Sequence, residues 1–154
     1  MPPPTAKPRV MVDADVLLAA CASPTQHGAS LVILRLAEAT LVDAYASEQV
    51  ITEVERNLTA RLPRALSIFE SIVGRSLRLV ADPAPEQVAQ YAGCAHEEDL
   101  PILVAAVLAG CRRLVSFNVR HFRPGCAQVE VVRPGELVRR IRDVLSSMGP
   151  ARDA

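Results

Sequence analysis

The chain alternates between short apolar runs and longer stretches in which apolar residues recur with a helical period. Residues 10–12 are apolar at successive positions, as in a central strand whose two faces are both buried. Strands are predicted at residues 9–12, 41–46, 77–80, 114–117 and 129–132. Helices are predicted at residues 16–20, 30–39, 47–62, 63–74, 86–94, 100–109 and 134–148. This alternation predicts a three-layer α/β/α fold with a central parallel sheet of about four to five strands.

Proline and glycine mark the limits of these elements. Residues 23–28 form a loop rich in breakers, and Gly110 is predicted to end a helix. We expect one domain at residues 9–148. A flexible, proline-rich tail at residues 1–8 precedes it, and a second tail at residues 149–154 follows it.

The composition bounds what this domain can be. The chain has 154 residues, half of them hydrophobic, and only 3% aromatics, so its core has to be built from aliphatic side chains. The formal net charge is zero, so nucleic-acid binding would need a local basic patch. No stretch has the length and apolarity of a membrane span, and the start is not a signal peptide. We therefore expect a cytoplasmic protein with no membrane partner.

The four cysteines are Cys21, Cys94, Cys111 and Cys126, and none of them forms a CxxC pair. We expect buried free thiols in a reducing compartment. Cys94 and His96 are too isolated to predict a zinc site, which would need two more ligands at suitable spacing.

Acidic and amide residues recur where predicted strands end or helices begin. They are Asp13 and Asp15 after the first strand, Glu53 in the helix after the second, Asp99 before a helix, and Asn118 after the fourth strand. Ligands of open α/β sheets bind at the carboxyl ends of the strands, so we expect these side chains to meet at one edge. Clustered carboxylates repel one another unless a cation holds them, and hard oxygen ligands suit Mg2+ or Mn2+. Such a metal can orient a phosphodiester and activate a water.

Simpler roles remain open for several of these residues. Asp13 and Asp99 each stand where a helix N-cap would be, and Asp99 can serve as cap and ligand together. Glu53 can be a solvated helix position, although it lies at the edge of the apolar stripe. Asn118 can be a plain turn residue.

Histidine and arginine side chains near the third and fourth motifs are less specific. His96 and His121 are more simply interpreted as structural or exposed than as catalytic. Arginine binds phosphate bidentately, so the arginines around the fourth strand are candidate RNA-binding residues, with a solvated face as the alternative. These arginines are Arg112, Arg113, Arg120 and Arg123.

Four segments keep an order and spacing that together are specific. They are VMVDADVLL at residues 10–18, SEQVITEV at 47–54, EDLPILVAA at 98–106 and LVSFNVRHF at 114–122. Through them the chain resembles the PIN-domain ribonucleases over about residues 9–134. It is most similar to the bacterial PIN proteins that are toxin components of toxin–antitoxin pairs, often grouped as VapC.

The resemblance implies a PIN-like fold and a metal-dependent ribonuclease that hydrolyses RNA phosphodiester bonds. It implies that Asp13, Glu53 and Asp99 are the first three acids of the site and hold Mg2+ or Mn2+. Asn118 matches the fourth position, where relatives often carry Asp. An amide is a weaker ligand, which leaves the presence of a second metal open.

The resemblance also implies supporting residues and partners. Asp15 stands where relatives often carry Asn, so its extra charge can partly offset the amide at the fourth position. Ser116 matches a small hydroxyl residue that orients the acids or a metal-bound water. The implied partners are an RNA substrate, an antitoxin protein and a second copy of the chain in a homodimer.

Two other functions remain open. A catalytically weak RNA-binding or scaffold PIN domain is favoured by Asn118. The acid pair of Asp13 and Asp15 after a strand also resembles the nucleophile motif of haloacid-dehalogenase-like phosphatases. Against this second alternative, Leu17 stands where that motif has Thr or Val, and the only lysine, Lys7, lies upstream of the strand.

Overall fold

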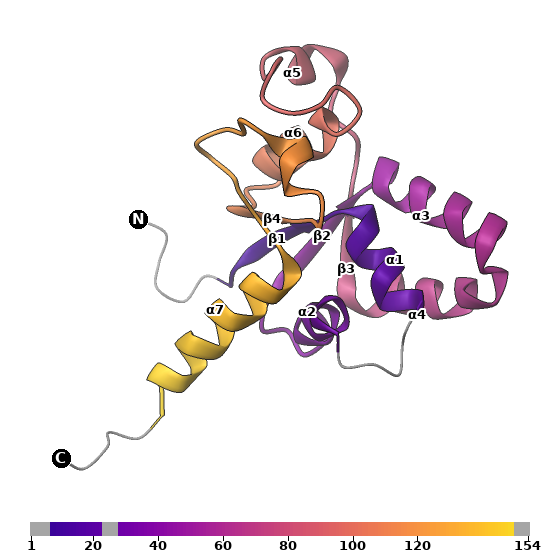
Figure 1. The fold of residues 1–154 in the computed structure, drawn as a ribbon, viewed down its shortest axis with the longest axis vertical. Helices are drawn as coiled ribbons and strands as arrows, with labels where there is room; N and C mark the ends of the chain where they lie inside the picture. The colour runs from indigo at the N-terminus through magenta and orange to yellow at the C-terminus, as the bar shows by residue number, and fades with distance from the viewer. Residues whose placement is uncertain (1–6, 23–27, 150–154) are drawn as a thin grey trace.

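Five parallel strands form the centre of the molecule (Figure 1). The structure is a computed structural model and describes residues 7–22 and 28–149. Its strands are β1 (Arg9–Val12), β2 (Asp43–Ser47), β3 (Leu77–Val80), β4 (Arg113–Val115) and β5 (Glu130–Val132). They stand in the order β3–β2–β1–β4–β5, and every neighbouring pair is parallel. The predicted parallel sheet, with the strand that precedes Asp13 at its centre, is confirmed.

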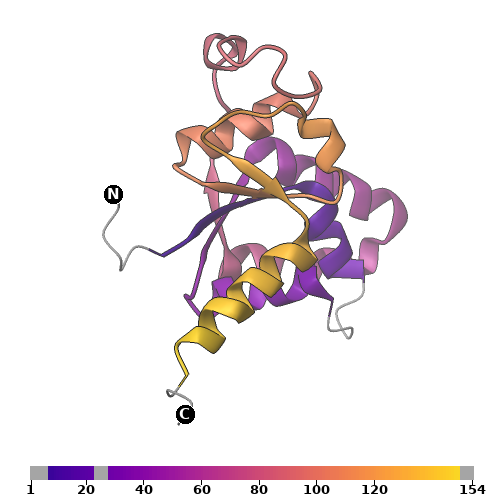
Figure 2. The ribbon, with the colours of Figure 1, turned by 60° about the vertical axis from the view of Figure 1, so that its left-hand side comes forward.

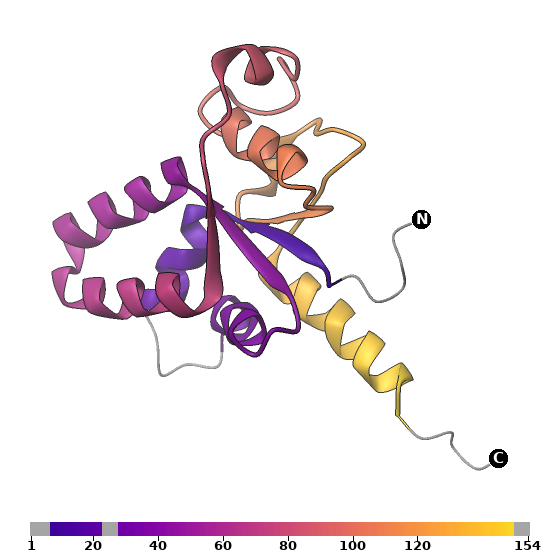
Figure 3. The same cartoon turned by 180° about the vertical axis from the view of Figure 1, so that it is seen from behind.

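Helices cover both faces of the sheet, which confirms the predicted three-layer fold (Figure 2). One face carries a connected group made of α1 (Ala14–Ala22), α2 (Ala29–Glu38), α3 (Glu48–Arg61), α4 (Leu66–Ser76) and α7 (Pro134–Ser147). The opposite face carries α6 (Leu100–Leu108), which contacts β1, β2 and β4, and α5 (Pro85–Ala89) beyond it. Two short 3-10 helices are η1 (Pro63–Ala65) and η2 (Val119–Phe122). Figure 3 shows α3 and α4 from behind, folded back on one another as a helical hairpin whose connection contains η1.

The connections change direction at β1. From β1 the chain reaches β2 and then β3 through helices on one face, and it returns to β4 through α6 on the other face. The crevice between the carboxyl ends of β1 and β4 is therefore a topological switch point. In open α/β sheets this is where ligands bind.

The core is mostly aliphatic, as the composition predicts, with Phe69 and Phe122 as its largest fully buried side chains. Val10, Met11 and Val12 are at most 1% exposed because helices cover both faces of β1. α6 is apolar on nearly every side, and six of its nine residues are buried, as expected for a helix enclosed by its neighbours. Within the described part of the chain, no helix combines the length and apolarity needed to cross a membrane.

The cysteines are free thiols, as predicted. Cys21 and Cys111 are buried, and burial raises the pKa of these thiols to about 11 and about 12, so both stay protonated at neutral pH. Cys94 and Cys126 are only half-buried.

The predicted start of the second strand was wrong by two residues. β2 begins at Asp43 because the preceding residues close the end of α2. Thr40 has φ 63°, its N–H donates to the carbonyl of Ala37 (3.0 Å), and the N–H of Leu41 donates to the carbonyl of Leu36 (2.9 Å). This is the Schellman pattern of helix termination, so Leu41 belongs to the helix end.

Other boundaries also differ. The fourth strand ends at Val115 rather than at residue 117, and the helix predicted at 86–94 spans only Pro85–Ala89 before the chain turns through Gly93, whose φ is 85°. The helix predicted at 63–74 is split into η1 and α4, with Gly74 inside α4. Most of the predicted loop at 23–28, and most of both predicted tails, lie outside the described residues.

Candidate functional site

Asp13 is a buried carboxylate at the carboxyl end of β1. Val12 is paired with Val115 of β4, and the N–H of Asp13 donates to the carbonyl of Val115 (3.0 Å), so the next residues of both strands lie side by side. Oδ1 of Asp13 accepts from the N–H of Ala14 (2.8 Å), and Oδ2 accepts from Oγ of Ser116 (2.7 Å). Asp13 is only 6% exposed. Its second oxygen is committed across the sheet, so a helix cap alone does not account for this residue.

Asp15 lies beside Asp13 in the first turn of α1. Its Oδ2 accepts from the N–H of Phe117 (3.0 Å) and lies 3.3 Å from Oγ of Ser116. Its Oδ1 is buried and has no hydrogen-bond partner. Buried polar atoms are nearly always paired, so this orphaned oxygen is the kind of acceptor that a cation satisfies.

Ser116 connects the two acids to the loop after β4. Its hydroxyl has a single proton, which the shorter bond gives to Asp13. The same oxygen accepts from the N–H of Asn118 (3.0 Å). The hydroxyl thus fixes the relative positions of Asp13 and the loop, and Ser116 is itself fully buried.

The acids disfavour one another's charge. Burial, followed by the charge of Asp15, raises the pKa of Asp13 from 3.8 to about 6, although the hydrogen bond from Ser116 opposes this. Burial raises the pKa of Asp15 as well. Burial, and then the charges of Asp99 and Asp15, raise the pKa of Glu53. These carboxylates are close enough to repel, and a divalent cation would relieve the repulsion.

Glu53 and Asp99 line a polar cleft of about 550 Å³ beside this pair. Ser47 begins α3 by accepting a hydrogen bond from the N–H of Val50 (3.4 Å). Gln49 then ties the helix start to two loops: its N–H donates to Asp82 (2.9 Å), and its Nε2 donates to the carbonyl of Glu98 (2.9 Å). These contacts set one turn of α3, and hence Glu53, opposite the start of α6. The cleft is lined by Gln49, Thr52, Glu53, Arg56, Asn57, Asp82, Glu98 and Asp99.

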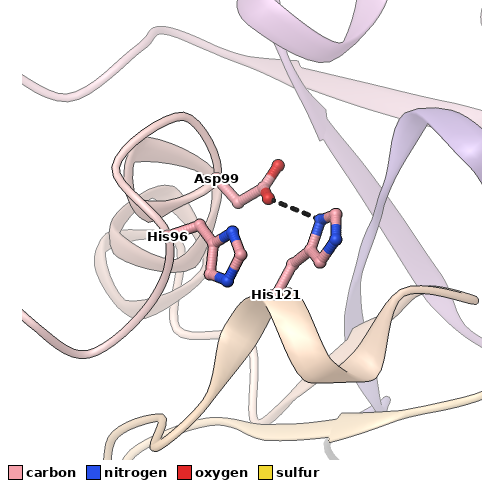
Figure 4. Close-up of side chains that lie close together, drawn as sticks. All are labelled: His96, Asp99 and His121. Atoms are coloured by element: carbon pink, nitrogen blue, oxygen red, sulfur yellow. Dashed lines mark hydrogen bonds and ion pairs between the residues drawn. The ribbon is translucent and has the colours of Figure 1, made fainter.

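Asp99 stands at the N-cap position of α6, but its side chain makes no capping hydrogen bond. Instead its Oδ2 lies 3.1 Å from Nδ1 of His121 in η2 (Figure 4). The ring of His121 stacks on the ring of His96, with centroids 4.6 Å apart and planes 11° from parallel. Sequence reasoning assigned both histidines to structural or exposed roles. Their only sequence signal was their place in the segments next to Asp99 and Asn118.

The remaining candidates are more dispersed. Asn118 is exposed after β4, and its backbone is fixed through Ser116. Arg112 and Arg113 lie at the amino end of β4, and Nε of Arg113 is 3.8 Å from Glu130. Arg120 and Arg123 lie in and just after η2, past the carboxyl end of the strand. The structure thus separates the four arginines into two pairs at opposite ends of β4.

Two residues that sequence reasoning missed also border the acids. Phe117 is 44% exposed although its backbone N–H binds Asp15. The other four aromatic side chains are buried or half-buried. Arg56 lines the cleft one turn after Glu53. An exposed aromatic ring and a cation beside clustered acids suit a nucleic-acid strand.

Comparison with known families matches residues 9–120 to a family model described as PIN domain. The chain belongs to the PIN-domain family. This match favours the PIN interpretation of Asp13 and Asp15 over the phosphatase-like one. No curated protein matches this PIN domain in sequence.

Two solved structures share the fold of this PIN domain. VapBC2 from Rickettsia felis, bound to a DNA fragment from its promoter, aligns at 15% identity with a TM-score of 0.63 and covers 81% of this chain and 98% of its own. VapC20 from Mycobacterium tuberculosis, a toxin that cleaves the sarcin–ricin loop, aligns at 18% identity with a TM-score of 0.57 and covers 78% of this chain and 98% of its own. At these identities the likeness establishes the fold.

Proposed function

We propose that this PIN domain is an Mg2+- or Mn2+-dependent endoribonuclease and the toxin component of a toxin–antitoxin pair. The observation that carries the proposal is the burial and raised pKa of the Asp13 carboxylate. This carboxylate is buried, has a raised pKa, and lies beside the orphaned buried oxygen of Asp15 at the switch point of the sheet. Burying two neighbouring carboxylates, one of which has an unpaired oxygen, costs stability, and a bound cation would offset this cost.

The donor set fits a hard divalent cation. Asp13 and Asp99 would hold it directly, and Glu53 directly or through a water, since Mg2+ prefers oxygen ligands and retains several waters. When bound, such an ion orients a phosphodiester, polarises its oxygens and activates a water. Ser116 holds the Asp13 carboxylate in place through its 2.7 Å hydrogen bond.

The surroundings support an RNA strand as substrate. Phe117, whose backbone N–H binds Asp15, is 44% exposed, and its ring offers a face on which a base can stack. Arg56 supplies a cation in the cleft, where phosphates would otherwise be repelled by the acids. Arg120 and Arg123, which lie in and just after η2 beyond the carboxyl end of β4, are the further candidates for phosphate binding. Arg112 and Arg113, at the far end of β4, are assigned a weaker part in this binding.

The partner assignments rest on the structural neighbours, which are VapBC2 and a VapC20 toxin. By this analogy we propose that an antitoxin protein binds the chain, that the chain forms a homodimer, and that it acts in the cytoplasm. Co-expression with the product of the adjacent gene, followed by co-purification and a growth assay, tests the antitoxin assignment.

A second function is supported by Asn118. An amide replaces a carboxylate at the fourth position of the site, so a domain that binds RNA but cleaves it weakly is the alternative. Cleavage of a defined RNA in Mn2+, in Mg2+ and in chelator separates the two. We expect metal-dependent products from the wild type, none from Asp13→Asn or Asp99→Asn, and unchanged cleavage by Asp143→Asn. Asp143 is 74% exposed on α7 and serves as the matched control. RNA binding without products from the wild type would establish the alternative.

A further inference from the structure

The structure brings together one mixed group of nitrogen and oxygen ligands that the sequence did not predict. Within residues 7–22 and 28–149, His96, Asp99 and His121 form a cluster in which one ligand atom from each lies within 4.8 Å of the others. Figure 4 shows the three side chains close together. Asp99 is half-buried and the two histidines are exposed, so an ion has access to all three.

The backbone holds this cluster together. The N–H of His96 donates to the carbonyl of His121 (2.8 Å), and the N–H of Asp99 donates to the carbonyl of His96 (3.0 Å). The N–H of His121 donates to the carbonyl of Asn118 (3.0 Å). The loop before α6 and the 3-10 helix after β4 are therefore fixed to each other, and the three side chains start from a preorganised frame.

The chemistry of this donor set differs from that of the acids around the carboxyl end of β1. Asp13, Asp15 and Glu53 offer only oxygen atoms, which suit Mg2+ or Mn2+. Two imidazoles and one carboxylate suit Zn2+ and its neighbours, and three protein ligands leave one tetrahedral position open for water. Asp99 belongs to both sets, so an ion held by the two histidines would compete with Asp13 and Glu53 for its carboxylate oxygens.

We propose that His96, Asp99 and His121 form a site for a borderline transition-metal ion, Zn2+ in the cell, and that its occupation inhibits the nuclease by engaging Asp99. The proposed metal site depends only on the geometry of this cluster, whereas the proposed inhibition rests on the proposed ribonuclease function.

Because the two imidazole rings are stacked, one of them has to turn before both can bind the same metal ion. The lone pair of an imidazole nitrogen lies in the ring plane, and the two planes are only 11° from parallel. Both nitrogens therefore face one ion only after one ring turns. The side chain of His121 is 47% exposed and His96 is exposed too, so rotation is not blocked by packing. Metal binding replaces the stack and the contact between Asp99 and His121 with a chelate.

Cobalt(II) tests the site without any cleavage assay, because its visible absorption bands report coordination number and ligand type. We expect the wild type to show tetrahedral bands that one equivalent of Zn2+ abolishes. His96→Gln and His121→Gln should each lower the Co2+ affinity at least about tenfold, as the loss of metal-site contacts generally does. Asp13→Asn and Cys94→Ser should keep the bands, because neither removes a ligand of the cluster.

Several outcomes would overturn the site. These are the absence of tetrahedral bands in the wild type, a Co2+ affinity in both histidine variants equal to that of the wild type, or thiolate-to-cobalt charge transfer that Cys94→Ser removes. The last outcome would establish a cysteine site instead.

The inhibition is tested by titrating Zn2+ into the cleavage reaction at fixed Mg2+, with each variant compared with its own rate without zinc. We expect the half-inhibiting Zn2+ concentration to rise at least about tenfold in His96→Gln, because one ligand is lost. Equal inhibition of His96→Gln and the wild type would refute the regulatory role. If the wild type cleaves no RNA at all, the proposed ribonuclease function fails while the cobalt spectrum still decides the site.

Discussion

The hydroxyl of Ser116 donates a 2.7 Å hydrogen bond to the carboxylate of Asp13, which lies 103 residues earlier in the chain. The bond exists because β1 and β4 pair in parallel with Val12 opposite Val115, so the residue after each strand emerges at the same edge. It is the shortest contact made by either acid of the pair and the one that ties the end of β4 to Asp13.

Replacing Ser116 with alanine should therefore weaken the site and the fold together. Asp13 loses a donor that lowers its pKa, and the N–H of Asn118 loses its acceptor. We expect a free energy of unfolding lower by about 1–3 kcal/mol. We also expect a Mn2+ affinity reduced about tenfold or more, because Ser116 supports a metal ligand. Ser116→Thr keeps the hydroxyl and is the control. Urea unfolding and calorimetry with Mn2+ measure both effects, and an alanine variant that matched the wild type in both would contradict the role of this bond.

The raised pKa of Asp13 predicts how Asp13→Asn changes stability with pH. In metal-free protein the folded state holds the Asp13 proton up to about pH 6, whereas the unfolded state releases it near 3.8. Between these values the folded state binds more protons, so the Asp13 contribution to the free energy of unfolding falls as pH rises. Above pH 6 the full penalty is present, about 3 kcal/mol at 1.36 kcal/mol per pKa unit.

Asn cannot ionise, so the variant escapes this penalty, although its contact with Ser116 is weaker. In chelator at pH 7.5 we expect Asp13→Asn to be as stable as the wild type or up to about 2 kcal/mol more stable. At pH 4 this advantage should vanish. Asp143→Asn should show no such pH-dependent difference. A variant destabilised equally at both pH values would show instead that Asp13 acts mainly as a structural cap.

Divalent metal should stabilise the wild type more than Asp13→Asn. A ligand that binds only the folded state raises the free energy of unfolding by about 2.7 kcal/mol at one hundred times its dissociation constant. In the variant the site lacks its most buried acid, so the shift should be much smaller. Thermal melting in a Mn2+ series measures the difference. Equal shifts in both proteins would place the metal elsewhere.

Phe117 should contribute to RNA affinity through its ring. Base stacking on an aromatic side chain is worth about 1–3 kcal/mol, so Phe117→Leu should weaken RNA binding roughly 5- to 150-fold in chelator. Leu108→Ala, at an exposed apolar position at the opposite end of α6 from Asp99, is the control. The chain has no tryptophan, so Phe117→Trp adds a single fluorophore that RNA should quench. Quenching of Leu108→Trp to the same extent would argue against stacking at Phe117.

The fold and part of the candidate site were readable from local patterns. Residues 10–12 are apolar on both faces and are followed at once by Asp13, so strand position and acid position came from the same short stretch. The predicted ends of helices and strands were wrong where a tertiary contact or a strained residue determines the end of the element. Thr40 takes a positive φ that its side chain does not favour, and β4 ends where Ser116 turns toward the acids.

The contact between Asp99 and His121 was not predictable in the same way. It depends on the 3-10 turn after β4, whose residues show neither a helical nor a strand period. The positions of the arginines were not predictable for the same reason. Arg113 and Arg120 are only seven residues apart, yet they lie at opposite ends of the three-residue strand β4. Proximity in sequence says little about shared surface when a strand intervenes.

Because the chain is synthesised from its N-terminus, the bond between Asp13 and Ser116 can form only late in synthesis. At about 5–20 residues per second, a ribosome needs about 5–20 s to pass from codon 13 to codon 116. During that interval β1 lacks its neighbour β4, and the nascent chain holds acids with no hydroxyl to position them. The candidate site therefore cannot be completed until at least 116 of the 154 residues have been made.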